Sequence, residues 1–252
     1  MRRENALSWL TARPIAHRGL HDVASGVIEN TRSAFEAAIA GRYGIECDVQ
    51  ASADGEAMVH HDEALGRLTE GNAPLANMTA KALKAVAFKA TADHMLTLSE
   101  LCQLVDGRVP LVVEIKSRFD GSLGLTRRVA EVLGGYRGPV AAMSFDPAPI
   151  ALLRDIAPSL TRGIVAERHY RHHEWDALPA ATKRNLAYFL HAPRTRPQFI
   201  AYAVKDLPAA APLVARHLFG LPLLTWTVRS PADRDTAARY ADQMIFEGFR
   251  AP

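Results

Sequence analysis

This 252-residue chain contains few cysteines and has a small net charge. Cys47 and Cys102 are its only cysteines, and both lie in apolar segments. Two such residues predict reduced, buried thiols rather than a disulfide framework. The formal net charge is only +3, with acidic and basic residues mixed along the chain. The basic excess that is typical of a nucleic-acid-binding protein is therefore missing, and no nucleic-acid partner is expected.

Long apolar runs are missing as well. No run approaches the roughly 20 residues that a helix needs to span a bilayer, so no stable membrane insertion is expected. Arg2 and Arg3 are not followed by an uninterrupted apolar segment, which argues against a secretory signal peptide. Hydrophobic residues make up 48% of the chain and charged residues 23%, as in ordinary globular proteins. We therefore expect a soluble, cytoplasmic protein.

Apolar, strand-like segments alternate with helix-like segments along the chain. The predicted strands are 14–19, 44–52, 109–116, 139–145, 161–166, 199–204, 221–228 and 243–246. The predicted helices are 3–12, 31–40, 98–105, 125–133, 149–156, 175–190, 209–219 and 231–240. Apolar runs without strict alternation are typical of parallel strands buried on both faces. Eight strands alternating with helices predict a single α/β domain over residues 1–252, a TIM (β/α)₈ barrel, with an open doubly wound sheet as the alternative.

The second predicted strand carries two acids on one face. Glu46 and Asp48 are two residues apart, so in a strand they point the same way, while Cys47 points to the other side. The pair Asp54-Gly55 is a strong hairpin signal, and the hairpin would bring His61 back beside the two acids. Taken alone, the stretch also fits a solvated edge strand with surface acids. Residues 63–95 are less regular and predict a small insertion after this hairpin.

Polar residues also interrupt other strands near their ends. His17 and Arg18 end the first strand, and Glu114 and Lys116 share one side of the third. Each pair on its own is equally compatible with a surface ion pair. In TIM barrels, however, the working groups lie at the C-terminal ends of the strands. Three strands that deliver polar pairs to one rim predict a common site.

The composition of this predicted site indicates its chemistry. Glu46, Asp48 and Glu114 offer only oxygen ligands, which suit one hard divalent cation such as Mg²⁺ or Ca²⁺ better than zinc. Three carboxylates and a divalent cation together carry −1, and the two basic residues nearby bring the sum to +1. This charge complements one anionic phosphodiester, and His17 and His61 remain to move protons.

These residues together resemble the glycerophosphodiester phosphodiesterase family. The motifs that carry the resemblance are, in order, His17-Arg18-Gly19, Glu29-Asn30-Thr31, Glu46-Cys47-Asp48, Asp54-Gly55, His61-Asp62, Leu98-Ser99-Glu100, Glu114-Ile115-Lys116, Ser144-Phe145-Asp146 and Thr225-Trp226-Thr227-Val228. A lone His-Arg-Gly is common, but the ordered set is specific.

The resemblance implies a TIM barrel that hydrolyses glycerophosphodiesters to sn-glycerol 3-phosphate and an alcohol. It implies these roles: metal ligands Glu46, Asp48 and Glu114; acid–base residues His17 and His61; phosphate clamp Arg18 and Lys116; substrate-pocket wall Trp226. Trp226 fits equally well as a buried aromatic at the barrel rim. The alternatives for function are a lysophospholipase D-type enzyme acting on lipid-derived diesters and a barrel that binds a phosphodiester without turnover. The residues do not assign base and acid to the two histidines, and they leave the substrate 2-hydroxyl and water as alternative nucleophiles.

The C-terminal segment departs from the resemblance, and one further stretch stands out. The last strand of the family usually reads Ile-Thr-Asp-x-Pro, whereas this chain has Ile245-Phe246-Glu247-Gly248-Phe249, so Glu247 is a candidate for the missing aspartate. The basic stretch 168–173 suggests either a second metal site or an anion site. It lacks a clean ligand spacing, and we therefore predict a solvated basic loop.

Overall fold

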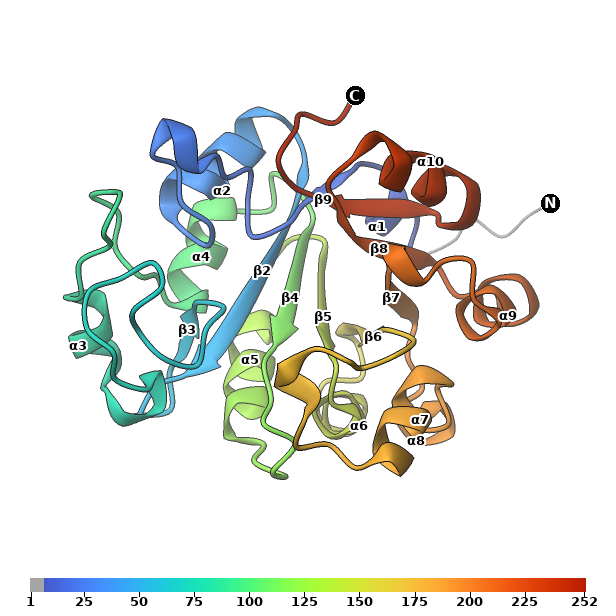
Figure 1. The fold of residues 1–252 in the computed structure, drawn as a ribbon. Helices are drawn as coiled ribbons and strands as arrows, with labels where there is room; N and C mark the ends of the chain where they lie inside the picture. The colour runs from blue at the N-terminus through green and yellow to red at the C-terminus, as the bar shows by residue number, and fades with distance from the viewer. Residues whose placement is uncertain (1–6) are drawn as a thin grey trace.

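Eight parallel strands close into a ring at the centre of the molecule (Figure 1). The computed structural model describes residues 7–252. The ring consists, in order, of β1 (Ile15–Ala16), β2 (Gly44–Ala51), β4 (Leu111–Ile115), β5 (Val140–Ser144), β6 (Thr161–Ala166), β7 (Phe199–Ala203), β8 (Leu223–Val228) and β9 (Gln243–Phe246). It closes because β1 pairs with both β2 and β9. The predicted TIM barrel is confirmed, and the open doubly wound sheet is excluded.

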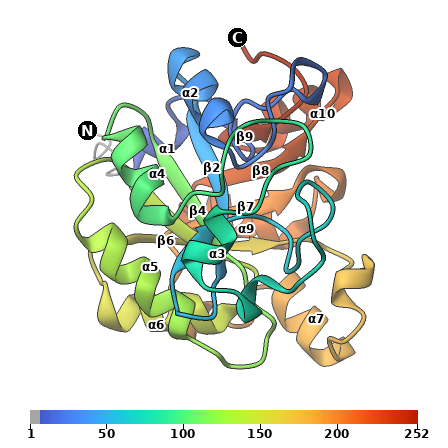
Figure 2. The same ribbon diagram turned by 90° about the vertical axis from the view of Figure 1, so that its left-hand side faces the viewer.

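Helices follow most of the strands and pack around the outside of the ring (Figures 1 and 2). They are α2 (Arg32–Ala40), α4 (Leu98–Val105), α5 (Gly124–Gly134), α6 (Pro147–Ile156), α7 (Ala180–Ala187), α8 (Ala192–Thr195), α9 (Ala210–Phe219) and α10 (Pro231–Tyr240). Local sequence sets their ends: Thr97 and Glu100 form a capping box at the start of α4. Within residues 7–252, no helix combines the length and apolar character needed to cross a membrane.

Two predicted helices are wrong in extent. The helix predicted over 175–190 is broken into a 3₁₀ turn, η3 (His173–Trp175), and the separate helix α7. Pro179 caps the start of α7 and disfavours helical backbone before it, and Phe189, with φ of 55°, lies beyond its end. The N-terminal helix α1 covers only Ser8–Thr11, and residues 3–6 of the predicted helix lie outside the described residues.

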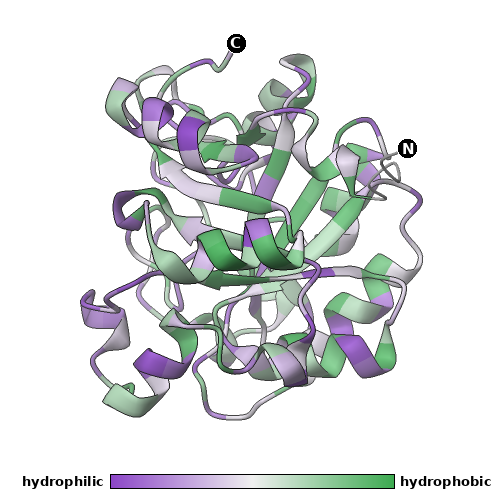
Figure 3. Ribbon diagram, turned by 90° about the vertical axis from the view of Figure 1, so that its right-hand side faces the viewer, coloured by the Kyte–Doolittle hydropathy of each residue, from purple (hydrophilic) through white to green (hydrophobic). Residues whose placement is uncertain are grey.

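The strands separate two apolar cores. One fills the barrel and includes Val112, Val165, Phe199 and, from α1, Leu10. A Cβ atom on Gly163 would lie 2.3 Å from the Phe199 ring, so a glycine is needed for this ring to fill the barrel. The other core lies between the strands and the helices, whose ribbons carry both hydrophobic and hydrophilic residues (Figure 3).

A hairpin and an insertion lie outside the ring. β3 (Ala57–Val59) pairs antiparallel with β2, and the turn between them contains Gly55 at φ of +80°. The region predicted as an insertion, residues 63–95, contains η2 (Leu75–Asn77) and α3 (Ala80–Lys84) and lies beside the barrel (Figure 1). Its apolar residues form a small cluster of their own with Met58 of β3. The extra strand and insertion therefore extend the barrel next to the end of β2.

Candidate active site

Three buried carboxylates face one another inside the barrel. Glu46 and Asp48 lie on β2, and Glu114 lies beside Asp48 in the register of β2 and β4. One carboxylate oxygen from each lies within 4.8 Å of the others. Cys47 belongs to the outer core, as the alternation along the strand predicts. We call Glu46, Asp48 and Glu114 the acidic triad.

Two basic side chains partly neutralise the acidic triad. Lys116 Nζ lies 2.7 Å from Asp48 Oδ1 and 2.6 Å from Glu114 Oε1. Arg18 Nε lies 3.1 Å from Asp48 Oδ2, and Arg18 Nη1 lies 2.7 Å from Glu29 Oε1. Both basic residues also line the cavity above the triad. The structure thus brings the predicted phosphate clamp to the site, where it forms ion pairs with the acids.

The acidic triad has one more carboxyl group than it has basic neighbours to neutralise it. Three carboxylates against Arg18 and Lys116 leave a formal charge of −1, and Glu46 Oε1 is buried without a hydrogen-bond partner among the described residues. Burial and the neighbouring carboxylates raise the pKa of Glu46 well above its usual range. Burial acts in the same direction on Asp48, but Lys116 and Arg18 outweigh it and hold the pKa of Asp48 well below its usual range. An unpartnered oxygen in an all-oxygen donor set fits a hard divalent cation.

His17 stands between the acidic triad and the carboxylate of Glu247. Its Nδ1 lies 2.5 Å from Glu247 Oε2, and its Nε2 lies 3.9 Å from Glu46 Oε2. The pairing of β1 with β9 places Ala16 beside Phe246 and so brings the next residues together. Burial lowers the pKa of His17, although the hydrogen bond to Glu247 acts to raise it. Burial would raise the pKa of Glu247, but His17 and His21 hold it well below its usual range.

The imidazole of His61, like that of His17, has a carboxylate at its Nδ1 atom. It follows β3, and its Nδ1 lies 2.8 Å from Asp62 Oδ1. Arg67 Nε holds the other oxygen of Asp62 at 2.7 Å, and Arg67 also pairs with Glu29. His17 and His61 line the same cavity. The hairpin therefore returns His61 to the acids, as the Asp54-Gly55 signal predicts.

The cavity above these residues has a volume of about 640 Å³ and an aromatic side. Trp226 of β8 lines it and packs edge-on against Phe145, with 5.4 Å between the ring centroids. The Nε1 atom of Trp226 is buried and has no partner among the described residues. Trp226 is therefore both a rim aromatic and a wall of the cavity, and its role in substrate binding stays a prediction.

The basic loop 168–173 lies at the rim of the cavity. Arg171, His172 and His173 are exposed, as predicted for a solvated loop. Tyr170 is 1% exposed and packs against Trp175, with 5.4 Å between the ring centroids. The prediction is wrong for Tyr170, because its ring serves as the apolar anchor that holds the loop on the barrel.

Some residues of the site were not predicted from the sequence. Asn30 donates a hydrogen bond from Nδ2 to Asp48 Oδ2 at 2.9 Å, and Glu29 links Arg18 to Arg67. Both belong to a motif that carries the resemblance, but the motif alone assigns no role to either residue. Asn30 has a φ of 56°, a conformation that asparagine adopts more readily than most residues. The signal in the sequence that could have pointed to Asn30 is its place in the Glu29-Asn30-Thr31 motif.

Comparisons with known proteins identify the family of this chain. A family model described as the glycerophosphoryl diester phosphodiesterase family matches residues 17–248. A glycerophosphodiester phosphodiesterase of Caldanaerobacter subterraneus is 32% identical over 161 residues, which are 60% of this chain and 65% of that protein. One of Bacillus altitudinis is 29% identical over 165 residues, which are 60% of this chain and 64% of that protein. The matched region thus spans slightly less than two-thirds of each relative.

Two solved structures share the fold over nearly the whole chain. A phosphodiesterase of Oleispira antarctica, in complex with the product sn-glycerol-3-phosphate, superposes with a TM-score of 0.75 at 18% identity, covering 94% of both chains. A glycerophosphodiester phosphodiesterase of Thermotoga maritima superposes with a TM-score of 0.68 at 23% identity, covering 92% of both chains. At these identities the likeness concerns the barrel fold.

Proposed function

The chain belongs to the glycerophosphoryl diester phosphodiesterase family, and on this premise we propose that it hydrolyses glycerophosphodiesters to sn-glycerol 3-phosphate and an alcohol. The observation that carries the proposal is that Glu46, Glu114, two histidines and two basic side chains line one cavity, with a carboxylate oxygen of Asp48 within 4.8 Å of those of the two glutamates. Binding alone would not need two proton-transfer groups, so a catalytic role explains more of the site than a binding role does.

The acidic triad would hold one divalent cation, Mg²⁺ or Ca²⁺. When bound, such a cation supplies Lewis-acid stabilisation of the charge that develops on phosphoryl oxygens. Arg18 and Lys116 line the same cavity, and their charges complement the nonbridging oxygens of one phosphodiester. Trp226 would bound the substrate, with its unpartnered Nε1–H as a donor.

His17 and His61 would divide the two proton transfers. One imidazole takes the proton of the attacking hydroxyl, and the other gives a proton to the oxygen of the leaving alcohol. Each ring has a carboxylate at Nδ1, so each has Nε2 free to exchange a proton with substrate. The two rings line one cavity, as opposite transfers on one phosphorus require.

The nucleophile that we favour is the substrate's own 2-hydroxyl. It is tethered next to the ester, and intramolecular groups of this kind reach effective molarities of about 10⁵–10⁸ M. The new bond joins O2 to phosphorus, the bond to the alcohol breaks, and a cyclic phosphate results. Water then adds to phosphorus and gives up a proton, the P–O2 bond breaks, and O2 takes a proton, which yields sn-glycerol 3-phosphate. A 2-deoxy analogue hydrolysed at a rate close to that of the parent would rule out this route in favour of direct attack by water.

A turnover assay tests the function. Purified protein is incubated with glycerophosphocholine and with either Mg²⁺ or Ca²⁺, and both products are quantified. We expect equal amounts of sn-glycerol 3-phosphate and choline, and much less of each from Glu114→Gln. Binding without products would indicate the non-catalytic barrel. Turnover of lysophosphatidylcholine in preference to glycerophosphocholine would indicate the lysophospholipase D-type enzyme.

A further inference from the structure

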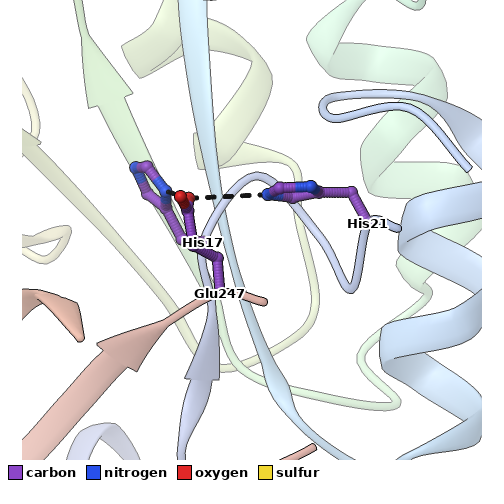
Figure 4. Close-up of side chains that lie close together, drawn as sticks. All are labelled: His17, His21 and Glu247. Carbon is purple, nitrogen blue, oxygen red and sulfur yellow. Dashed lines mark hydrogen bonds and ion pairs between the residues drawn. The ribbon is translucent and has the colours of Figure 1, made fainter. Parts of the chain in front are cut away.

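The carboxylate of Glu247 is surrounded by three basic side chains. His17 Nδ1 lies 2.5 Å from Oε2, and His21 Nε2 lies 3.5 Å from the same oxygen. Arg229 Nε lies 2.5 Å from the other oxygen, Oε1. Figure 4 shows the two imidazoles on either side of the carboxylate. Both oxygens are therefore engaged, and the side chain has little freedom to rotate.

The backbone on either side of this contact is fixed by the barrel. The N–H of His17 donates to the carbonyl oxygen of Phe246 at 2.9 Å, and the N–H of Glu247 donates to that of Val228 at 3.1 Å. These bonds continue the ladders β1–β9 and β8–β9 beyond the last paired residues. Glu247 and His17 thus meet on neighbouring strand ends rather than on mobile loops.

We propose that Glu247 is a positioning residue for His17: its carboxylate holds the imidazole as the Nδ1–H tautomer, with Nε2 directed toward the acidic triad. A carboxylate only accepts hydrogen bonds, so the ring nitrogen that faces it carries the proton. In a neutral imidazole the other nitrogen, Nε2, then carries the lone pair. The inference rests on the proposed function, in which Nε2 of His17 exchanges a proton with substrate.

Glu247 and the two histidines beside it are also close enough together to be considered as a metal site. Ligand atoms of His17, His21 and Glu247 lie within 4.8 Å of one another. Two ligands of a tetrahedral zinc ion, each about 2.0–2.1 Å from the metal, lie about 3.3 Å apart. The separation of 2.5 Å between Nδ1 and Oε2 is too short for two ligands of one zinc ion and is that of a short, direct hydrogen bond. The geometry therefore favours a hydrogen-bonded pair.

The first part of the test measures steady-state kinetics with glycerophosphocholine. Glu247→Gln keeps the shape and an acceptor oxygen but removes the charge, so we expect kcat to fall about 10- to 100-fold with KM changed less than about 3-fold. Glu247→Asp keeps the charge at a shorter reach and is expected to recover part of the loss. Glu36→Gln is the matched control, since it removes one carboxylate charge from the exposed pair with Arg32 on α2. It should leave both constants unchanged.

The second part reads the tautomer without turnover. Imidazole ¹⁵N spectra of the metal-free protein distinguish Nδ1–H from Nε2–H rings, and His17→Gln identifies the His17 signals among those of the ten histidines. We expect the Nδ1–H form in the wild-type protein and its loss in Glu247→Ala.

Three results would overturn the inference. They are an Nε2–H ring at His17 in the wild-type protein, an unchanged kcat in folded Glu247→Gln, and zinc binding that shifts both His17 and His21 in a Glu247-dependent manner. A wild-type protein that turns over no glycerophosphodiester, while His17 keeps the Nδ1–H form, would instead contradict the proposed function and leave the positioning contact in place.

Discussion

Two histidines line the cavity, each with a carboxylate at its Nδ1, and the two histidine–carboxylate pairs differ in how the chain brings them together. In one pair His61 and Asp62 are neighbours in sequence, 2.8 Å apart at a turn after β3. In the other pair His17 and Glu247 are 230 residues apart and are joined by the first and last strands of the ring. The two pairs have the same local chemistry, yet one depends on a single turn and the other on closure of the whole barrel. The His17–Glu247 pair is therefore the one that should report on the integrity of the ring.

Removal of the proposed divalent cation should have the largest effect, because both histidines line the same cavity as Glu46 and Glu114. Exhaustive chelation is expected to remove several kcal/mol of transition-state stabilisation. This loss should lower kcat on the order of 10³-fold or more. Readdition of Mg²⁺ or Ca²⁺ should restore it. After chelation, the His17→Ala and His61→Ala variants should have similar residual values of kcat. Activity that survives chelation would contradict the role of the triad.

Loss of either imidazole should come next. His17→Ala and His61→Ala are each expected to lower kcat by about 10²–10⁴-fold, the usual range for general acid–base catalysis. A substrate whose leaving group has a low pKa needs no protonation, so it should rescue the variant that lacks the acid and not the one that lacks the base. Equal rescue of both variants would argue against separate roles. A variant that loses stability but keeps its turnover would show that its histidine has only a structural role.

The sequence predicted the half of the site that depends on local geometry. Glu46 and Asp48 were placed on one face because side chains alternate along a strand. Glu114 joined them because the ends of parallel strands meet at one rim. His61 could be placed because a hairpin turn has a strong local signal. Each of these inferences uses residues close in sequence or a general property of barrels.

The rest of the site depends on contacts that no local pattern encodes. Glu247 was only a candidate for a missing aspartate, because its contact with His17 exists only once β9 pairs with β1. Glu29 had no assigned role, since its partner Arg67 lies 38 residues away in the insertion. The broken helix near Pro179 shows a further limit, because helical periodicity there concealed a proline that starts a new helix.

The free energy of unfolding, measured at decreasing pH, should distinguish the carboxylates of the two pairs from ordinary surface acids. Burial opposes ionisation in both, but their basic partners hold the pKa values of Asp62 and Glu247 well below the usual range. A carboxyl whose pKa is depressed in the folded state stabilises the protein above its unfolded pKa, which is about 4, and this stabilisation is lost as the pH falls below that value.

Urea unfolding at several pH values provides the measurement. Asp62→Asn and Glu247→Gln are each expected to lower the free energy of unfolding by about 1–3 kcal/mol at pH 7. The cost should shrink as the pH falls from 4 to 3, because the wild-type protein then loses the same stabilisation. Glu36→Gln should show neither effect. A cost that stays constant over this range would mean that lost packing, rather than lost charge, explains it.

A substitution at Tyr43 should have a smaller effect, and it tests whether the His17–Glu247 pair depends on closure of the barrel. Tyr43 lies between α2 and β2, and its hydroxyl donates to the carbonyl oxygen of Ala251 at 2.5 Å. Its ring also packs edge-on against Phe246, with 5.1 Å between the centroids. Tyr43 thus holds the segment on both sides of Glu247 against the barrel, far in sequence from the hairpin that carries His61.

Tyr43→Phe keeps the ring contact and removes only the hydrogen bond, so we expect a cost of about 0.5–1.5 kcal/mol in the free energy of unfolding. Two backbone amides then serve as local reporters in hydrogen exchange. The N–H of His17 donates to Phe246 across the closing strands, whereas the N–H of His60 donates to Asp48 within the hairpin. Exchange should accelerate at His17 and stay unchanged at His60, because the variant loosens the closure and not the turn. Equal acceleration at both amides would show that the two pairs share one unit of stability.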